Sequence, residues 1–259
     1  LNRFWVVQGP SGRPEDATPH SRFGMIDQKG RIVGKVDYDF LMPMEEGLAA
    51  AGRKNRFGFV DARGRQVVPF RYESLPGSFH EGLARVEVKG KHGYIDPKGR
   101  TVIAPAYDEA GDFHEGFALV RTGEKRFFID RKGQPAFGGL EVKAGGWRAE
   151  FGEGLAAVEL ADGRRGLLDR TGTLVVDGSR WPWRHIRPFR NGRAAVSLVA
   201  GDRLVWGFID REGFLAIVAR YAEVHDFDGP LAHVFERGSR LLLIDAAGEV
   251  VRACSAGDR

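Results

Sequence analysis

The sequence has almost no cysteine and no long apolar run. Cys254 is the single cysteine among 259 residues, which excludes an internal disulfide framework and a zinc site built from several cysteines. No apolar run approaches the ~20 residues that a membrane-spanning helix needs, so the sequence predicts no membrane insertion. It also lacks any stretch of amphipathic helical period with caps, and we therefore expect little helix.

A strong charge of one sign is also lacking. The chain carries 39 basic and 35 acidic residues, for a formal net charge of +4. Because basic residues alternate with acidic ones and form no stripe, the sequence predicts no nucleic-acid partner. Hydrophobic residues at 42% and charged residues at 29% are typical of a globular chain rather than a disordered one.

Glycine, by contrast, is abundant, and it marks a repeat. The 36 glycines are roughly twice the usual share. The string Asp-x-x-Gly recurs seven times after an apolar pair, and a second string, Phe-x-Glu-Gly-Leu-Ala or a weaker copy, stands between the occurrences. Strings that recur in register along a whole chain predict a repeat architecture. The seven units are anchored at Asp27, Asp61, Asp96, Asp130, Asp169, Asp210 and Asp245.

Residues 82–116 illustrate what one unit predicts. Residues 83–88 alternate between apolar and polar, which is typical of a strand with one buried face. Residues 93–96 and 101–104 form two further apolar strands. Between them, the Asp-Pro-Lys-Gly of residues 96–99 has the composition of a type I turn. Each unit is therefore predicted to be a three-stranded antiparallel meander, and its connector could add a short fourth strand.

The predicted fold class is all-β, with seven tandem meander repeats of about 35–40 residues in a single domain over residues 1–259. A meander whose central strand is apolar on both faces must be sandwiched between its neighbours. Radial closure into a seven-bladed propeller-like ring and an open β-solenoid-like array both achieve this. We prefer the ring, because all seven units are complete and no polar capping sequence is present.

These strings resemble the bacterial WG-repeat (KWG-type) family along essentially the whole chain. Residues 206–213, Trp-Gly-Phe-Ile-Asp-Arg-Glu-Gly, contain the naming dipeptide, and residues 93–118 match nearly the full unit. The resemblance implies a binding or scaffold role with no catalytic motif, and often an exported protein. Phe127 and Leu242 replace the glycine of the pair, and we expect their units to pack less regularly.

No motif of catalysis or metal binding stands out. Each Asp-x-x-Gly has one acid where a calcium loop needs several converging oxygens, so a turn is the favoured interpretation. His80-Glu81 and His114-Glu115 occupy equivalent positions, but Gly152 stands where a third metal ligand would be needed. No nucleophile elbow, phosphate loop or zinc-protease motif is present. We therefore expect no enzyme, no cofactor and no metal. The recurring glutamates, expected to accept backbone N–H groups, are Glu46, Glu81, Glu115 and Glu153.

The candidate binding face lies where the repetition breaks. The interval from Asp to the next Phe is 17 or 18 residues in regular units, but 21 after Asp130 and 20 after Asp169. Insertions on one face of a repeat array often mark its binding face, and Trp and Arg are enriched at binding hot spots. The candidate binding residues in these two connectors are Trp147, Arg148, Trp181, Trp183, Arg184, His185, Arg187 and Arg190.

Two alternatives remain open for these residues. The tryptophans could instead replace a missing connector Tyr in the core, an interpretation favoured for Trp147 and about equally good for residues 181–187. If they bind, replacing Trp183 and Arg187 with Ala should weaken partner binding with little loss of thermal stability.

The function predicted first is a non-catalytic scaffold for another protein. A glycan-binding or cell-envelope polysaccharide-binding module is the alternative, since the same aromatic side chains can stack on sugar rings. A hydrolase or lyase with an axial site is less favoured, because the repeats supply mainly turn-forming Asp residues there.

Overall fold

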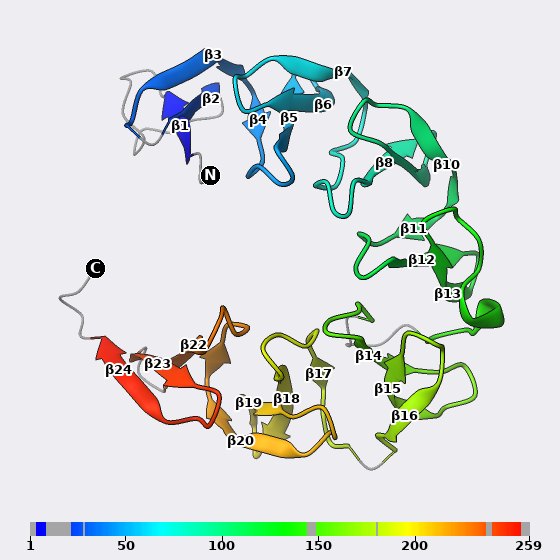
Figure 1. The fold of residues 1–259 in the computed structure, drawn as a ribbon, viewed down its shortest axis with the longest axis vertical. Coiled ribbons are helices and arrows are strands. Elements are labelled where there is room, and N and C mark those ends of the chain that lie inside the picture. The colour runs from blue at the N-terminus through cyan, green and yellow to red at the C-terminus, as the bar shows by residue number, and fades with distance from the viewer. Residues whose placement is uncertain are drawn as a thin grey trace. The chain divides into compact units, whose positions relative to one another are not determined.

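The computed structural model describes residues 4–8, 22–27, 29–143, 149–179, 181–236 and 240–254. These residues form seven small antiparallel sheets and one short 3-10 helix, η2 (Phe137–Gly139), with no α-helix among them (Figure 1). The prediction of an all-β chain of seven meander repeats is confirmed. The closed or open arrangement of the sheets stays a prediction. None of the described helical segments could cross a membrane.

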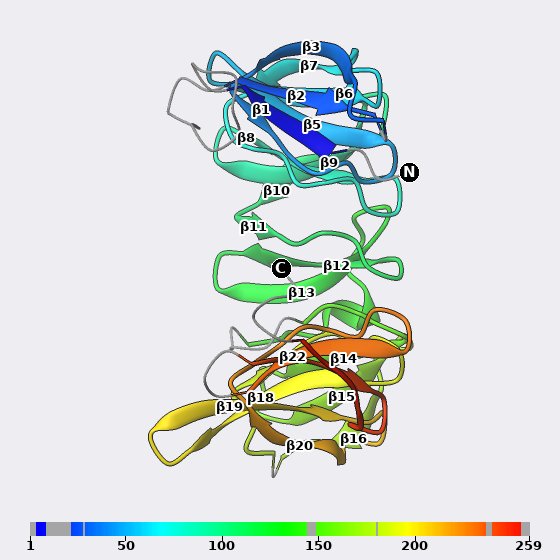
Figure 2. The ribbon, with the colours of Figure 1, turned by 90° about the vertical axis from the view of Figure 1, so that its left-hand side faces the viewer.

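The described residues belong to two compact units. The first comprises residues 1–124 and 129–134, and the second comprises residues 125–128 and 135–259. Six of the sheets are meanders of strands A, B and C, whereas the fourth sheet has strands A and B but no strand C. Four sheets, the fourth among them, add a short strand D, from the preceding connector, beside strand A. The longest A and B strands, β18 and β19, form the hairpin that projects in Figure 2.

The strand bounds follow the repeats. The strands of the first three sheets are β1 (Phe4–Gln8), β2 (Arg22–Ile26) and β3 (Ile32–Tyr38); β4 (Phe40–Leu41), β5 (Leu48–Arg53), β6 (Arg56–Asp61) and β7 (Gln66–Tyr72); and β8 (Ala84–Val88), β9 (Lys91–Ile95) and β10 (Thr101–Tyr107). The fourth sheet comprises β11 (Glu109–Ala110), β12 (Phe117–Thr122) and β13 (Lys125–Asp130).

The last three sheets lie in the second unit. They comprise β14 (Leu155–Glu159), β15 (Arg165–Asp169) and β16 (Leu174–Asp177); β17 (His185–Ile186), β18 (Ala194–Ala200), β19 (Arg203–Ile209) and β20 (Leu215–Tyr221); and β21 (Glu223–Val224), β22 (Leu231–Phe235), β23 (Leu241–Asp245) and β24 (Val250–Cys254).

Each Asp-x-x-Gly string is the turn that follows strand B and leads into strand C where that strand forms. The carboxylate of Asp96 accepts the backbone N–H groups of Lys98 and Arg100, both at 2.9 Å. Gly99 donates its N–H to the Asp96 carbonyl at 2.8 Å and has φ of +77°, a conformation that glycine adopts without strain. The glycine of all seven strings has positive φ. The turn interpretation of the motif is confirmed.

The aspartates of these turns are expected to make the stability of the fold depend on pH in the acid range. The side-chain hydrogen bond from Arg31 holds the pKa of Asp27 below its usual value of 3.8, and the Thr171 hydroxyl does the same for the pKa of Asp169. A carboxylate whose pKa is lower in the folded state contributes stability above the unfolded-state value and loses it as the pH falls through the folded-state value.

We therefore expect the melting temperature to hold between pH 7 and 5 and to fall from about pH 4 downward. Scanning calorimetry from pH 7 to 3 measures this. Asp169→Asn should show a shallower acid loss than wild type, whereas Asp202→Asn, at an exposed hairpin tip, should keep the wild-type profile. A melting temperature that stays constant down to pH 3 would contradict this expectation.

The glycine that opens strand B leaves room for a bulge in strand C. In the third sheet, β9 and β10 pair at Tyr94 with Ile103 and next at His92 with Tyr107, so strand C carries extra residues opposite Gly93. A Cβ on Gly93 would lie 2.5 Å from the Ile103 carbonyl oxygen and 2.6 Å from the Pro105 nitrogen. Such distances are below van der Waals contact, so the position excludes any side chain.

The two repeats without this glycine depart from the pattern in different ways. In the fourth, which has Phe127, no C strand forms; η2 and isolated pairing such as Phe127 with Glu141 follow the turn instead. The expectation of less regular packing is confirmed there. In the seventh, which has Leu242, strand C pairs without a bulge at this point, Leu242 lying opposite Ala253. That repeat is more regular than expected, because a strand C without a bulge at this point does not require a glycine at the opposite position of strand B.

The core lies between successive sheets of each unit. Phe79 and Ile95 of the third repeat pack in one buried cluster with Phe59 and Val68 of the second. Phe189 and Ile209 of the sixth repeat likewise share a cluster with residues of the fifth. Each meander thus buries its apolar faces against its neighbours, as the two-sided apolar B strands require.

Glutamates of the Phe-x-Glu-Gly string also connect successive repeats. The carboxylate of Glu46 accepts the backbone N–H groups of Glu81 and Gly82, at 2.7 and 2.8 Å. Glu81 in turn accepts the N–H of Gly116 at 2.8 Å. The predicted role as an acceptor for backbone donors is confirmed for Glu46, Glu81 and Glu153, the last of which accepts the N–H of Gly192 at 2.8 Å. The bonds run from one repeat to the next.

Candidate functional site

The structure places six of the eight predicted binding residues, all in the second unit. Trp147 and Arg148 lie outside the described residues. The other six belong to the connector over residues 181–190, which includes the short strand β17. Its strand pairs with β18, Ile186 lying opposite Val196, and this fixes the direction of the side chains around it.

Trp181 and Trp183 are half-buried and pack against the core cluster that contains Phe189 and Ile209. A Cβ on Gly213 would lie 2.5 Å from the Trp181 ring, so this indole rests directly on the Asp-x-x-Gly turn between β19 and β20. The Trp183 indole nitrogen is buried and has no hydrogen-bond partner. These contacts are the ones expected if the two tryptophans belong to the core rather than to a binding face.

Three of the predicted residues line one pocket of about 500 Å³ in the second unit, and they are His185, Arg187 and Arg190. Five further residues line this pocket, which we call the Arg187 pocket: Glu150, Ile186, Pro188, Trp206 and Asp226. The predicted residues Trp181, Trp183 and Arg184 are not among those that line it.

Trp206 is the aromatic centre of the Arg187 pocket. The His185 ring stacks on it, with ring centroids 5.8 Å apart and planes 17° apart. The Arg187 guanidinium carbon lies 4.7 Å from the centroid of the Trp206 ring, which is cation–π geometry. Strand D with the residue that follows it, and strand B of the same sheet, therefore bring these three side chains together across the β18 strand that separates them.

Arg187 is held in place by the following repeat. Its guanidinium donates to the Val224 carbonyl at 3.0 Å and lies 3.4 Å from an Asp226 carboxylate oxygen. Arg190 is exposed, and no described residue pairs with its guanidinium. The pocket therefore presents one fixed and one free guanidinium beside an aromatic ring.

His185 and Ser197 form a pair that resembles part of a nucleophilic site. The His185 Nδ1 lies 2.8 Å from the Ser197 hydroxyl oxygen. Ser197 has no exposed surface, so its hydroxyl cannot reach a substrate carbonyl. The pair instead fixes the orientation of the imidazole that stacks on Trp206.

The two histidines of the Phe-His-Glu-Gly strings lie side by side in the first unit. The rings of His80 and His114 are 5.4 Å apart, and Asp112 lies 3.9 Å from His80. Among the residues that the structure describes, no group of three His, Cys, Asp or Glu side chains could hold a metal ion.

Sequence reasoning missed Trp206 and Asp226 as members of the pocket. Trp206 belongs to the Trp-Gly pair. It contacts Arg187 of the connector, which stands 19 residues earlier in the chain. Asp226 directly precedes the connector Phe227, the position that Pro188 and Glu150 hold before their own Phe residues. If the connector sequences are aligned on the Phe of each string, the three lining residues Glu150, Pro188 and Asp226 fall at the same position.

A protein-family model described as "WG containing repeat" matches residues 23–55, 57–91 and 93–125. A search of curated proteins finds no match.

Solved structures share the fold at low sequence identity. BamB from Moraxella catarrhalis is 14% identical, with a TM-score of 0.52, covering 90% of this chain and 83% of that one. AztD from Citrobacter koseri is 13% identical, with a TM-score of 0.51 and coverage of 97% and 80%. A structure titled as the eukaryotic initiation factor is 11% identical, with a TM-score of 0.61 and coverage of 98% and 75%. The chain thus has a β-propeller-like fold.

Proposed function

Because this chain belongs to the WG-repeat family, we propose that it is a non-catalytic scaffold that binds another protein at the Arg187 pocket. A single observation carries the proposal. His185, Arg187 and Arg190, chosen from the sequence as binding residues, surround one pocket together with Trp206. Arg and Trp are the side chains that most often supply the energy of protein–protein interfaces.

The state of the two arginines supports a protein partner that carries a carboxylate. Arg187 is already oriented by Val224, Asp226 and the Trp206 ring, so binding costs it little conformational entropy. Arg190 is exposed and offers a planar fork of donors that matches a carboxylate. We therefore assign the partner an Asp, Glu or C-terminal carboxylate at this point.

The non-catalytic assignment rests on the chemistry of the lining residues. The pocket holds a His, but its Nδ1 contacts the wholly buried Ser197, and no Ser, Thr, Cys or Lys side chain lines the pocket. Arg187 and Arg190 can bind an anion but cannot act as bases, since arginine stays protonated in proteins.

A glycan is less favoured as the partner because of the surroundings of Trp206. Sugar rings stack on an open aromatic face, whereas this ring already contacts the His185 imidazole and the Arg187 guanidinium. A glycan array that includes anionic polysaccharides is expected to show no binding. If the array shows binding, and the Arg187→Ala variant loses that binding, the partner at this pocket is a glycan and not a protein.

We expect Arg187→Ala combined with Arg190→Ala to reduce capture of a protein partner at least about tenfold, since buried charge pairs at an interface are costly to break. Pull-down from a lysate of the organism of origin, quantified by mass spectrometry, measures this. The matched control is Arg184→Ala, which removes an exposed arginine of the same connector outside the pocket. Equal loss in both variants, or none in either, would contradict the proposed site.

A further inference from the structure

The third repeat lacks a hydrogen bond that every other repeat with a described connector makes. In those repeats a connector N–H donates to the same carbonyl of strand A, at 2.7–2.9 Å. Where strand D forms, the donor is the residue directly before that strand. The five bonds run from Asp39 to Gly52, Asp108 to Arg121, Lys143 to Glu159, Arg184 to Ser197, and Ala222 to Phe235. The equivalent groups in the third repeat are the Ser74 N–H and the Glu87 carbonyl, and in the described part of the chain they do not bond.

The connector sequence explains the missing bond. Phe79 follows Tyr72 by seven residues, whereas the equivalent interval after Tyr38, Tyr107 and Tyr221 is six. The extra residue is accompanied by Pro76, which has no N–H to donate at the position where the other repeats form strand D. The chain rejoins strand A only at Gly77, whose N–H donates to the Arg85 carbonyl at 2.9 Å.

The outer edge of β8 is therefore open at Glu87. Alternate residues of an antiparallel strand direct their N–H and C=O groups to opposite neighbours. Since the Arg85 carbonyl faces the connector, the N–H and C=O of Glu87 face the same way, away from β9. In the described sheet, β8 is an edge strand, and such edges are templates for pairing with another chain.

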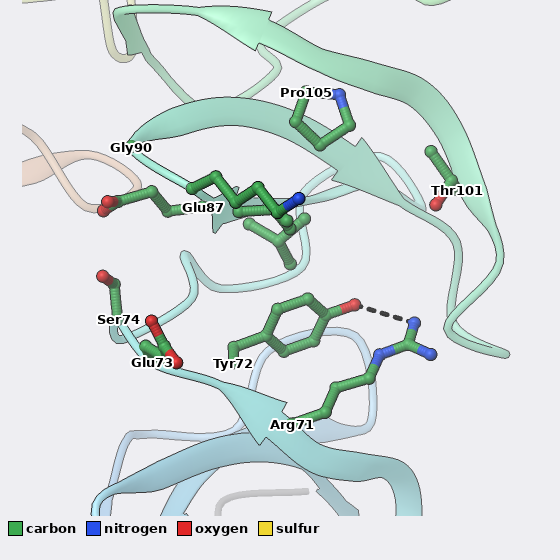
Figure 3. A pocket seen from close by; sticks show the side chains of 11 residues that line it. Arg71, Tyr72, Glu73, Ser74, Glu87, Gly90, Thr101 and Pro105 are labelled. Carbon is green, nitrogen blue, oxygen red and sulfur yellow. Dashed lines mark hydrogen bonds between the residues drawn. The ribbon is translucent and has the colours of Figure 1, made fainter.

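A pocket of about 500 Å³ opens at this edge. Figure 3 shows it between the segment of Tyr72, Glu73 and Ser74 on one side and the turn around Gly90 on the other. Val86, Val88 and Pro105 add apolar surface, and Val88 is 42% exposed.

The charged groups of this pocket leave little net charge for a ligand. Arg71 donates to the Tyr72 hydroxyl at 3.0 Å, the bond drawn in Figure 3, and to the Gly99 carbonyl at 2.8 Å. Glu73 pairs with Arg56 at 2.7 Å. Glu87 and Lys89 remain and have opposite charge. The site therefore suits an uncharged backbone with an apolar side chain.

We propose that the β8 edge binds an extended segment of another protein, which pairs with Glu87 in place of strand D and directs an apolar side chain over Val88 into the pocket. Main-chain hydrogen bonds supply the affinity of such strand addition, and the pocket supplies its specificity. This surface lies in the first unit and is separate from the Arg187 pocket.

The test uses a phage-displayed library of random linear peptides selected on the whole chain. We expect enriched peptides to bind wild type and Thr122→Arg alike, and to bind Val88→Arg at least about tenfold more weakly. Thr122 is the matched control, because it is the exposed equivalent of Val88 on β12, where strand D is present. On binding, hydrogen exchange of the Glu87 amide should slow.

A second variant restores the missing strand D. Deletion of Glu73 with Pro76→Ala returns the connector to six residues and removes the proline, so it should cover Glu87 and abolish peptide binding without lowering the melting temperature. Absence of any enriched peptide, or equal peptide binding by wild type and Val88→Arg, would overturn the proposal. The proposal would also be overturned if the wild-type chain self-associates and the Val88→Arg variant does not, because the edge would then bind a second copy of the chain.

Discussion

Gly93→Ala is expected to lower the free energy of unfolding by about 3 kcal/mol or more, because the added Cβ has nowhere to go. It would lie 2.5, 2.6 and 2.8 Å from backbone atoms of Ile103, Pro105 and Ala104, which cannot rotate away as a side chain would. Strand C would have to leave strand B and disturb the packing of the next sheet. Urea denaturation followed by tryptophan fluorescence measures the loss.

The matched control is Gly90→Ala in the same repeat. Gly90 has φ of +75°, but a Cβ there would meet no atom within 4 Å. Only the cost of a left-handed alanine remains, about 1 kcal/mol. Equal losses for the two variants would show that backbone conformation, and not the close approach of strand C, selects glycine in the Trp-Gly pair.

The second large effect is expected at Trp183. Its ring packs against the core cluster of the fifth and sixth repeats, and Trp183→Ala should cost about 2–3 kcal/mol, somewhat less than truncation of a fully buried aromatic ring. Trp183→Phe should cost under about 1 kcal/mol, since it keeps most of the ring and removes an indole N–H that is buried without a partner.

Arg184→Ala in the same connector should change stability by no more than about 0.5 kcal/mol, as exposed substitutions usually do. These measurements separate the two roles that the sequence left open for residues 181–187. If Trp183→Ala keeps the wild-type stability but loses the partner, Trp183 belongs to the binding site and not to the core.

Local features were predictable from the sequence. The Asp96 turn depends on atoms within four residues of one another, and such contacts follow directly from residue type and spacing. The Phe-x-Glu-Gly glutamates were expected to accept backbone donors. That their donors lie in the next repeat, 35 residues away for Glu46 and Glu81, follows only once the repeats are stacked.

The composition of the Arg187 pocket was not predictable in the same way. Arg187 contacts Trp206 and Val224, which stand 19 and 37 positions later in the chain. Their proximity depends on the order of strands in one sheet and on the position of the next. The sequence before Phe79 contains one extra residue and a proline. That these changes leave the edge of β8 without a strand D can be recognised only by comparison with the strand pairing of the other repeats.

Site-specific photocrosslinking tests the central claim most directly, namely that a protein partner docks at the Arg187 pocket. A benzophenone amino acid replaces Pro188, which lines the pocket, or Pro182, an exposed residue of the same connector outside it. We predict a discrete crosslinked protein from position 188 and none from position 182. Equal yields at both positions, a product from position 182 alone, or no product at either would contradict the account.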